Sequence, residues 1–318
     1  MNATREQRTE QALFRGGTLT LDSARYRETV RSFADLLLRD DLVPGDLTAK
    51  SLSIRDRHVE AVVMSRQGGV VAGLDEFGFL LRERGIEVKF EARDGEAIRP
   101  DQTLLGIKGS EATVLALERV GLNLVQRMSG IATAGHCLQE RARRSGAARI
   151  VGTRKTPWGL LDKRALHLGG VGTHRLGLGD AILIKNNHLA LLANTEEEAA
   201  PIAIERAWKF RSEAAFIEVE VRSEGAARAA AKTFRHLQEG LVEQYPCVLM
   251  LDNMTPGQIG GIVKMLQREG LWDDTLIEAS GGISESNVAE YATSGVDAIS
   301  IGAFTHSAKA LDVCLRIS

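Results

Sequence analysis

The chain has 318 residues, a formal net charge of −2, 44% hydrophobic and 26% charged residues, and 32 glycines. This composition is typical of a soluble globular α/β protein, long enough for one large domain or two of ordinary size. No run approaches the ~18–20 apolar residues that a membrane helix needs, and the polar amino terminus lacks the apolar core of a signal peptide. A near-neutral charge with 5% aromatic residues does not indicate a nucleic-acid partner.

The three cysteines are far apart in the sequence and make no metal-binding or redox spacing: Cys137, Cys247 and Cys314. We expect them to act as small hydrophobic residues in a reducing compartment, so the predicted location is the cytoplasm.

The first part of the chain reads as a leader followed by a small α+β region. Residues 1–25 are expected to be loosely held. Apolar spacing predicts a helix over residues 26–41, and short alternating runs between residues 59 and 107 predict an antiparallel sheet. A long helical pattern over residues 111–132 could bridge to the region that follows.

The second half repeats a different pattern, in which a short apolar strand ends in polar or glycine residues and a helix follows. The residues that follow the strands are Thr153-Arg154-Lys155, Lys185, Glu220, Asp252-Asn253, Glu278 to Gly282, and Gly302. The helices are expected over residues 196–211, 223–241, 255–269 and 285–293. Six or seven such repeats predict a parallel barrel with its chemistry at the carboxyl ends of the strands, and an open doubly wound sheet is the alternative.

Residues 149–188 are strongly basic. They contain seven Lys or Arg residues against two acids, together with three of the seven histidines and several glycines. A solvated, salt-bridged surface is the simpler interpretation of such a run. However, Arg154-Lys155 and Lys185 directly follow apolar strands, which favours a site for a small molecule that carries carboxylates or phosphates.

Acidic and glycine-rich strand ends complete the candidate site. Glu220 and Asp252 end neighbouring strands and could bind Mg²⁺ or sugar hydroxyls, or instead pair with the cations of the site. The loops at Ser280-Gly281-Gly282 and Gly302 are typical of a phosphate-binding cradle, to which His306 could add a donor. The residues alone therefore indicate a phosphorylated sugar and an acidic co-substrate.

From about Tyr26 to its end, the chain resembles the quinolinate phosphoribosyltransferase family, also called carboxylating nicotinate-nucleotide pyrophosphorylases. The matching stretches are Glu118-Arg119, Leu122-Asn123, Gln126 to Thr133, Thr153 to Thr156, His174-Arg175, Ile184-Lys185, Asn187-His188, Glu218-Val219-Glu220, Leu251-Asp252-Asn253, Ser280-Gly281-Gly282, Gly302 and Thr305-His306-Ser307. So many matches in the same order make the resemblance specific.

The resemblance implies an N-terminal α/β sandwich domain and an incomplete, about seven-stranded, parallel α/β barrel. On this basis we expect a leader at 1–25, the sandwich with its bridging helix at 26–132, the barrel at 133–305, and a C-terminal helix at 306–318 that packs on the N-terminal domain. The family implies a homodimer or a hexamer with shared active sites.

The resemblance also implies a reaction, in which quinolinate and phosphoribosyl pyrophosphate give nicotinate mononucleotide, pyrophosphate and CO₂ with Mg²⁺, in NAD biosynthesis. Residues carried over for quinolinate are Arg154, Lys155, His174, Arg175 and Lys185, with Arg119 reaching the partner subunit's site. Glu220 and Asp252 would hold the ribose and metal, and the 5′-phosphate would bind Ser280, Gly281, Gly282, Gly302 and His306. We expect Lys155, Lys185, Glu220 and Asp252 to be catalytic, without a nucleophilic side chain.

The sequence departs from the common family pattern at Gly152, Pro157-Trp158, Val171, Thr173 and Asn186. These departures cluster near the expected acceptor pocket, so one alternative is a related phosphoribosyltransferase that acts on a different heteroaromatic acid. A second alternative is a Schiff-base lyase that uses Lys185 as its nucleophile. A third is a nucleotide-binding sensor without catalysis.

Overall fold

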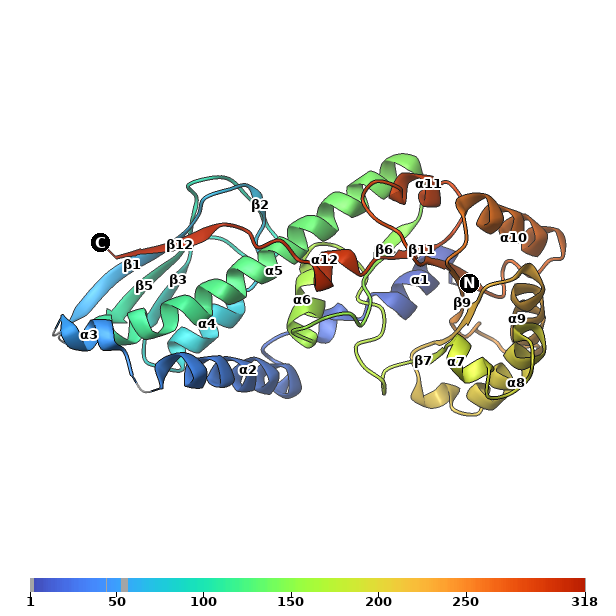
Figure 1. Cartoon of the computed structure of the whole chain (residues 1–318), viewed down its shortest axis with the longest axis horizontal. Coiled ribbons are helices and arrows are strands. Elements are labelled where there is room, and N and C mark those ends of the chain that lie inside the picture. Colours follow the sequence, from blue (N-terminus) through green and yellow to red (C-terminus); the bar gives the residue numbers. More distant parts are fainter. Residues whose placement is uncertain (1–2, 44, 53–56, 318) are drawn as a thin grey trace. The chain divides into compact units, whose positions relative to one another are not determined.

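A computed structural model of the chain describes residues 3–43, 45–52 and 57–317 (Figure 1). The chain divides into two compact units, which we name by their sheets. The parallel-sheet unit contains Met1–Gly16, Cys137–Lys155 and Val171–Ala303, and the antiparallel-sheet unit contains Gly17–His136, Thr156–Gly170 and Phe304–Ser318. Positions 1–2, 44, 53–56 and 318, which fall in the expected leader, sandwich domain and C-terminal helix, lie outside the described residues.

The parallel-sheet unit is built on six strands in the order β6-β11-β10-β9-β8-β7. Their bounds are β6 Arg149–Val151, β7 Ile182–Ile184, β8 Ile217–Val221, β9 Cys247–Asp252, β10 Leu276–Ser280 and β11 Ala298–Ser300. Strands β7 to β11 lie side by side in chain order, and the first strand, β6, pairs with the last, β11. A doubly wound sheet would reverse its strand order in the middle, so this order is that of an incomplete barrel that is open between β6 and β7.

About seven strands are expected in the barrel; its described residues form six strands and one isolated bridge. Gly172 makes a parallel bridge to Val151 of β6. Its N–H donates to the carbonyl of Ile150 at 2.9 Å, and its own carbonyl accepts from the N–H of Gly152 at 2.8 Å. The seventh strand is therefore reduced to a single residue, just before the predicted site residues His174 and Arg175.

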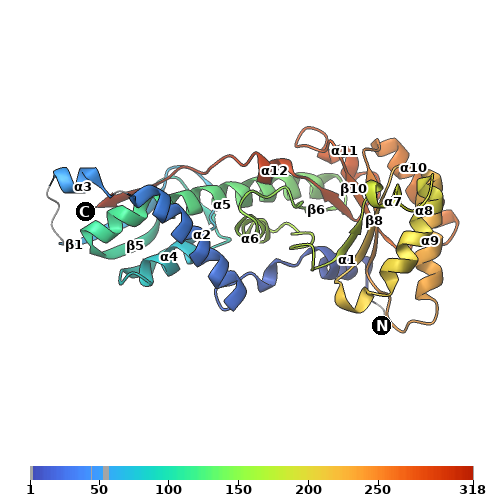
Figure 2. The ribbon, with the colours of Figure 1, turned by 60° about the horizontal axis from the view of Figure 1, so that its bottom comes forward.

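Helices follow the strands as the sequence pattern predicts. They are α7 Asn186–Leu189, α8 Glu196–Trp208, α9 Glu224–Gln238, α10 Pro256–Arg268 and α11 Val288–Ala292, with the short 3₁₀ helix η2 Arg211–Glu213. Helix α10 begins after Thr255, which caps it together with Gln258, and Pro256 is tolerated in the first turn. Figure 2 shows α8, α9 and α10 together on one side of the parallel sheet.

The prediction that residues 1–25 are a loosely held leader is wrong for residues 5–15. Helix α1 (Arg5–Leu13) begins at Thr4, which forms a capping box with Gln7. Arg5 donates to Asp297 and to the carbonyls of Trp272 and Thr275, at the start of β10 and β11. The helix is thereby attached to the amino-terminal end of the parallel sheet.

Helix α1 also completes the hydrophobic core at that end of the sheet. Ala12 and Leu13 are fully buried. The core cluster that they join consists of Val151, Ala181, Phe216, Val248, Leu276 and Ala298, most of them at or just before the first residue of a strand. Because a helix without a sustained hydrophobic run forms this contact, the sequence pattern alone did not reveal it.

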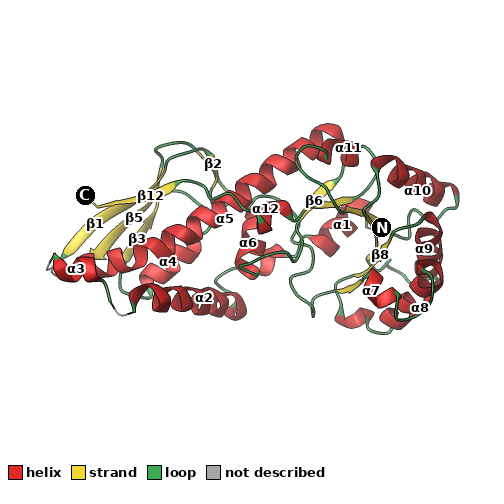
Figure 3. Cartoon of the chain, viewed as in Figure 1, coloured by secondary structure: helices red, strands yellow, loops and turns green. Residues whose placement is uncertain are grey.

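The antiparallel-sheet unit contains a four-stranded sheet in the order β12-β1-β5-β3 and a two-stranded sheet of β2 and β4 (Figure 3). The strands are β1 His58–Ser65, β2 Gly69–Val70, β3 Glu87–Phe90, β4 Ala97–Ile98, β5 Thr103–Ser110 and β12 Val313–Ile317. The helices are α2 Ala24–Leu42, α3 Leu47–Ser51, α4 Leu74–Arg82, α6 Leu160–Leu168 and α12 Ala303–His306, with the 3₁₀ helix η1 Gly16–Thr18. The predicted helix and antiparallel sheet are therefore confirmed.

The end of the chain forms a strand, where the sequence predicted a helix. Strand β12 pairs antiparallel with β1, from Val313 opposite Ser65 to Ile317 opposite Ala61. The last residues do pack on the N-terminal sheet, as expected. A single strand of five residues is stabilised by its neighbour in the sheet, which a sequence pattern does not contain.

Helix α5 (Glu111–Ser145) continues past its expected end at Ala132 and contributes residues to both units. Gly130 allows the C-terminal segment to approach the helix, because a Cβ atom at this position would lie 2.0 Å from the carbonyl oxygen of Lys309. Two hydrogen bonds hold the segment there, from Leu311 N–H to the Gln126 carbonyl and from the Gln126 amide to the Val313 carbonyl. Among the described helices, none is long and apolar enough to cross a membrane.

We expect Leu13→Ala to lower the free energy of unfolding by about 2–4 kcal/mol, because it leaves a cavity in the core that α1 completes. Leu191→Ala is the matched control, since the Leu191 side chain is 84% exposed. Urea unfolding followed by circular dichroism measures both. Equal, small effects of the two variants would contradict the role of α1 as part of the core.

Candidate active site

Three of the predicted site residues, Glu220, Asp252 and Ser280, lie on one face of the parallel sheet at its carboxyl ends. Successive side chains of a strand point to opposite faces, so Phe216, Glu218 and Glu220 at β8 share a face. The register aligns neighbours on this face: Glu220 with Met250, Met250 with Glu278, and Asp252 with Ser280. This inner face therefore has three levels. At the end covered by α1 it is apolar, with Phe216; next comes an acidic level, formed by Glu218 and Glu278; and the predicted site residues Glu220, Asp252 and Ser280 lie at the carboxyl ends.

Lys185, Glu220 and Asp252 meet at the carboxyl ends of β7, β8 and β9. Lys185 Nζ lies 3.9 Å from Glu220 Oε2. Burial, followed by the nearby Asp252 carboxylate, raises the pKa of Glu220, and Lys185 offsets only part of this effect. Two crowded carboxylates beside an ammonium can bind a cation or accept hydrogen bonds from hydroxyl groups.

The predicted cations of the site, here called the cationic wall, are Arg154, Lys155, Arg175 and Lys185. Arg175 is only 7% exposed, whereas Arg154 and Lys155 are exposed after β6. The Arg175 guanidinium donates to the carbonyl of Ala181 at 3.3 Å, and its buried Nε has no hydrogen-bond partner among the described residues. Burial, and then repulsion from Arg154, lowers the pKa of Arg175. Two arginines that repel one another, one of them incompletely hydrogen-bonded, are suited to an anionic ligand.

His174 lies deeper than predicted, against two buried carboxylates. Its Nε2 is 3.0 Å from Glu218 Oε2 and 3.4 Å from Glu278 Oε2, and both glutamates are fully buried. The ring also packs edge-on against Phe216, with centroids 5.4 Å apart. The imidazole therefore faces the acidic level of the sheet.

The hydrogen bond at Nδ1 of His174 limits where this cluster can carry a proton. Burial lowers the pKa of His174, but Glu218 and Glu278 outweigh it and raise that pKa to about 9. Burial and Glu278 raise the pKa of Glu218 to about 7. However, Nδ1 of His174 accepts a hydrogen bond from the N–H of Arg175 at 2.8 Å, which a proton on Nδ1 would break. The raised pKa values of His174 and Glu218 therefore belong to the coupled cluster rather than to either residue alone.

The same hydrogen bond argues against a metal ion in this cluster. His174, Glu218 and Glu278 offer ligand atoms within 4.8 Å of one another. A metal on Nε2 would require the ring proton to move to Nδ1, where the N–H of Arg175 already points. The bond to Nδ1 thus disfavours a metal ion on Nε2, while Nε2 and the carboxylate oxygens of Glu218 and Glu278 make no hydrogen bond among the described residues.

The glycine-rich loop after β10 has the backbone conformation expected of an anion cradle. Gly281 and Gly282 have φ values of 91° and 64°. A Cβ atom at Gly281 would lie 2.4 Å from Asn253 Oδ1, so only glycine fits beside the β9 loop. The N–H of Asn253 donates to the carbonyl of Ser280 at 2.9 Å and joins the two loops. Ser280 and Gly302 are partly buried at the ends of β10 and β11.

Three residues of interest belong to the antiparallel-sheet unit. Arg119 is exposed on α5, and His306 is exposed at the end of α12, with Nδ1 2.6 Å from Ser307 Oγ. The Trp158 ring packs against Phe33 and lies under the Arg127 guanidinium, with distances of 4.9 and 5.0 Å to the ring centroid. Trp158 is thus held within its own unit by an aromatic and a cationic neighbour.

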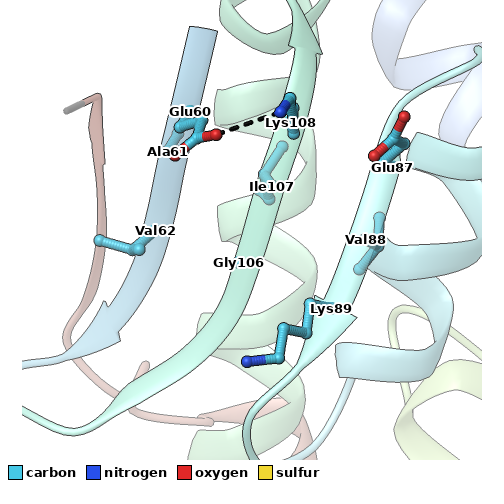
Figure 4. A pocket seen from close by; sticks show the side chains of 9 residues that line it. All are labelled: Glu60, Ala61, Val62, Glu87, Val88, Lys89, Gly106, Ile107 and Lys108. Atoms are coloured by element: carbon cyan, nitrogen blue, oxygen red, sulfur yellow. Dashed lines mark ion pairs between the residues drawn. The ribbon is translucent and has the colours of Figure 1, made fainter.

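A hollow on the antiparallel sheet contains none of these residues. Figure 4 shows it between β1, β5 and β3, where Glu60 and Lys108 form an ion pair at 3.3 Å. Lys89, which also lines it, pairs with Glu91 at 2.6 Å. Salt-bridged, outward-facing charges of this kind are typical of a solvated sheet face.

Two residues of the inner face were not among the predicted site residues, namely Glu218 and Glu278. The alternation of side chains could have found them, because Glu218 lies two residues before Glu220 and Glu278 lies two residues before Ser280. An acid at an interior position of a buried strand is rare without a partner. The partner, His174, comes from a loop, and this contact is visible only in the fold.

Comparison with known proteins agrees with this architecture. Residues 46–129 match the family model of the quinolinate phosphoribosyl transferase N-terminal domain, and residues 131–316 match that of the C-terminal domain. The chain is 39% identical over 277 residues to a probable carboxylating nicotinate-nucleotide pyrophosphorylase of Archaeoglobus fulgidus, covering 86% of this chain and 98% of the relative. It is 35% identical over 298 residues to the carboxylating nicotinate-nucleotide pyrophosphorylase of Mycobacterium leprae, covering 92% of this chain and 96% of the relative.

A solved structure shares the fold over almost the whole chain. The nicotinate-nucleotide pyrophosphorylase of Francisella tularensis superposes with a TM-score of 0.77 at 27% sequence identity, covering 92% of this chain and 96% of that one. Since both family models and relatives above 30% identity match, the chain belongs to the quinolinate phosphoribosyl transferase family.

Proposed function

We propose that this chain transfers the phosphoribosyl group of phosphoribosyl pyrophosphate to quinolinate, with decarboxylation, to give nicotinate mononucleotide, pyrophosphate and CO₂ in NAD biosynthesis. The observation that carries this proposal is the grouping, at the carboxyl ends of β7 to β10, of Lys185, the crowded carboxylates Glu220 and Asp252, and the positive-φ glycine loop after Ser280. A dicarboxylate, a ribose and a phosphate each find complementary groups there.

In the proposed mechanism, the enzyme positions two mutually repelling anions. Arg154, Lys155, Arg175 and Lys185 neutralise the carboxylates of quinolinate, while Ser280, Gly281, Gly282, Gly302 and His306 hold the 5′-phosphate. The ring nitrogen forms a bond to C1′ as the bond from C1′ to the pyrophosphate oxygen breaks. Positive charge that develops on the ribose is stabilised by Glu220 and Asp252.

Decarboxylation follows from the charge on the product ring. The quaternised nitrogen accepts the electron pair of the breaking bond to the adjacent carboxylate, CO₂ leaves, and a proton replaces it on the ring carbon. No side chain needs to act as a nucleophile. Lys185 fits an anion-binding role, because it is half exposed and paired with Glu220, whereas a Schiff-base lysine is desolvated or crowded by other cations.

Glu220 and Asp252 are also the residues that would hold Mg²⁺. Glu220 and Asp252 end neighbouring strands, and burial, followed by the charge of Asp252, raises the pKa of Glu220; a divalent cation bound between the two carboxylates would offset both effects. When bound, Mg²⁺ would supply charge neutralisation for the leaving pyrophosphate.

We further propose a cytoplasmic homodimer or hexamer with shared active sites. Arg119 is exposed on α5 and belongs to the antiparallel-sheet unit, so it is available to a second subunit. A basic residue from a partner would add to the cationic wall that binds the carboxylates.

The reaction is tested by following nicotinate mononucleotide and CO₂ together, with quinolinate, phosphoribosyl pyrophosphate and Mg²⁺. We expect equal amounts of both products, and a loss of about 10²-fold or more in turnover for Lys155→Ala. Lys264→Ala, at an exposed position of α10, is the control. Binding of phosphoribosyl pyrophosphate without any product would indicate a different heteroaromatic acid.

The metal assignment predicts that Glu220→Gln and Asp252→Asn raise the Mg²⁺ concentration needed for half-maximal turnover by about tenfold or more. Mn²⁺ binding, measured by electron paramagnetic resonance, should weaken in parallel. Glu290→Gln, on the exposed surface of α11, should change neither quantity. Unaltered Mn²⁺ binding in both site variants would remove these residues from the metal site.

Shared active sites predict complementation between inactive subunits. Mixed and reassociated Arg119→Ala and Lys155→Ala chains should recover about a quarter of wild-type turnover, because half of random dimers are hybrids with one intact site. Each variant alone should remain inactive. Failure to recover activity, although hybrids are seen by native mass spectrometry, would place Arg119 in its own subunit's site.

A further inference from the structure

The loop of residues 173–175, here called the anion loop, adopts a backbone conformation that needs external support. His174 has φ 54°, one of three positive φ values among the described non-glycine residues. For a residue with a ring on Cβ this conformation is strained and persists only where surrounding contacts determine it.

The first support comes from the N-terminal strap, residues 13–15, which directly follows α1. The N–H of His174 donates to the carbonyl of Leu13 at 2.8 Å. The N–H of Arg15 donates to the hydroxyl of Thr173 at 3.0 Å, and this hydroxyl donates to the carbonyl of His174 at 2.9 Å. Two successive residues of the anion loop are therefore bonded to a segment that is distant in sequence.

The strap also reaches the far end of the loop. Arg15 pairs with Asp180 at 3.2 Å, and Asp180 accepts a hydrogen bond from the N–H of Leu176 at 2.8 Å. The strap itself is anchored by the burial of Leu13 in the core. It lies outside residues 46–129 and 131–316, the ranges that match the family models.

The second support comes from the acidic level of the sheet. The Oε2 atoms of Glu218 and Glu278 lie 3.0 and 3.4 Å from Nε2 of His174, an electrostatic contact without aligned hydrogen bonds that keeps the ring beside the two carboxylates. The opposite nitrogen, Nδ1, accepts from the N–H of Arg175 at 2.8 Å. The imidazole is therefore a connector between two strands of the sheet and the backbone of Arg175.

We propose that the N-terminal strap and the Glu218–Glu278 pair are positioning elements, which hold the anion loop so that Arg175 meets a carboxylate of the acceptor. This inference rests on the proposed function of the cationic wall. His174 then acts through Arg175, and its imidazole is not itself a contact of the acceptor. Residues 1–25 thereby acquire a role in the site, through a helix and a strap that the family models do not include.

The proposal is tested in the full-length enzyme with variants that each remove one support. Thr173→Val keeps the shape but removes the hydroxyl that accepts from Arg15. Glu278→Leu removes an acceptor below His174, while Glu278→Gln keeps an oxygen there. Thr293→Val, at an exposed position, is the control for the threonine change.

We expect Thr173→Val and Glu278→Leu to raise the KM for quinolinate about tenfold, the equivalent of one positioning hydrogen bond. The KM for phosphoribosyl pyrophosphate should stay within about twofold, because the proposed positioning acts on Arg175, a contact of the acceptor. Glu278→Gln should restore most of the quinolinate affinity. Loss of active enzyme with unchanged KM values, or an equal rise in both KM values, would overturn the proposal and leave a purely structural role.

Two measurements test the positioning role without relying on turnover of quinolinate. Calorimetric binding of phthalate, an unreactive aromatic dicarboxylate, should weaken about tenfold in Thr173→Val. The ¹⁵N spectrum of the His174 ring should show an unprotonated Nδ1 in the wild type and a changed Nδ1 signal in Thr173→Val. An enzyme that turns over no quinolinate, but shows both changes, would refute the reaction and support the positioning role. A ring spectrum that is identical in the variant would refute the positioning role.

Discussion

The alternation of side chains along parallel strands is the constraint on which the rest of the site depends. Each strand of the parallel sheet points every second residue to the inner face. On β8 the same alternation places Phe216 in the apolar core, Glu218 among buried charges and Glu220 at the carboxyl end. A one-residue shift of any strand would exchange these groups for residues of the outer face. The precision of the site is thus a consequence of strand register.

Burying His174, Glu218 and Glu278 together is energetically demanding, and the arrangement explains how it is tolerated. An isolated buried charge costs several kcal/mol, and removing one member of a buried pair costs about 3–5 kcal/mol. Here the imidazole of His174 lies beside both carboxylates, and Arg175 lies close enough for Glu218 to influence its pKa. The net negative charge of the cluster therefore lies beneath a surplus of cations. The buried carboxylates reduce the repulsion between the arginines, so the arginines can remain close together before an anionic ligand binds.

The two ends of the chain show how a fold can use segments of weak pattern. The amino-terminal helix α1 closes the apolar end of the parallel sheet, and its strap bonds to the anion loop. The last strand, β12, adds an edge to the antiparallel sheet, and the segment that precedes it passes Gly130 of α5 at Lys309. Neither segment carries enough hydrophobic periodicity to predict its partner. Each is stabilised by tertiary contacts to residues far away in the sequence.

The sequence by itself determined the repeated strands and helices of the second half, the helix expected over residues 26–41, and the polar groups at the strand ends. These features are local, because apolar periodicity and the residue that follows a strand depend only on near neighbours in the chain. The resemblance carried by residues such as Arg154-Lys155, His174-Arg175 and Glu220 determined the family. Only the tertiary structure decided that α1 belongs to the core, that the chain ends in a strand, and that His174 faces Glu218 and Glu278. Those outcomes depend on which distant segments meet, since strand pairing, burial and side-chain partners are contacts between residues that no local pattern connects.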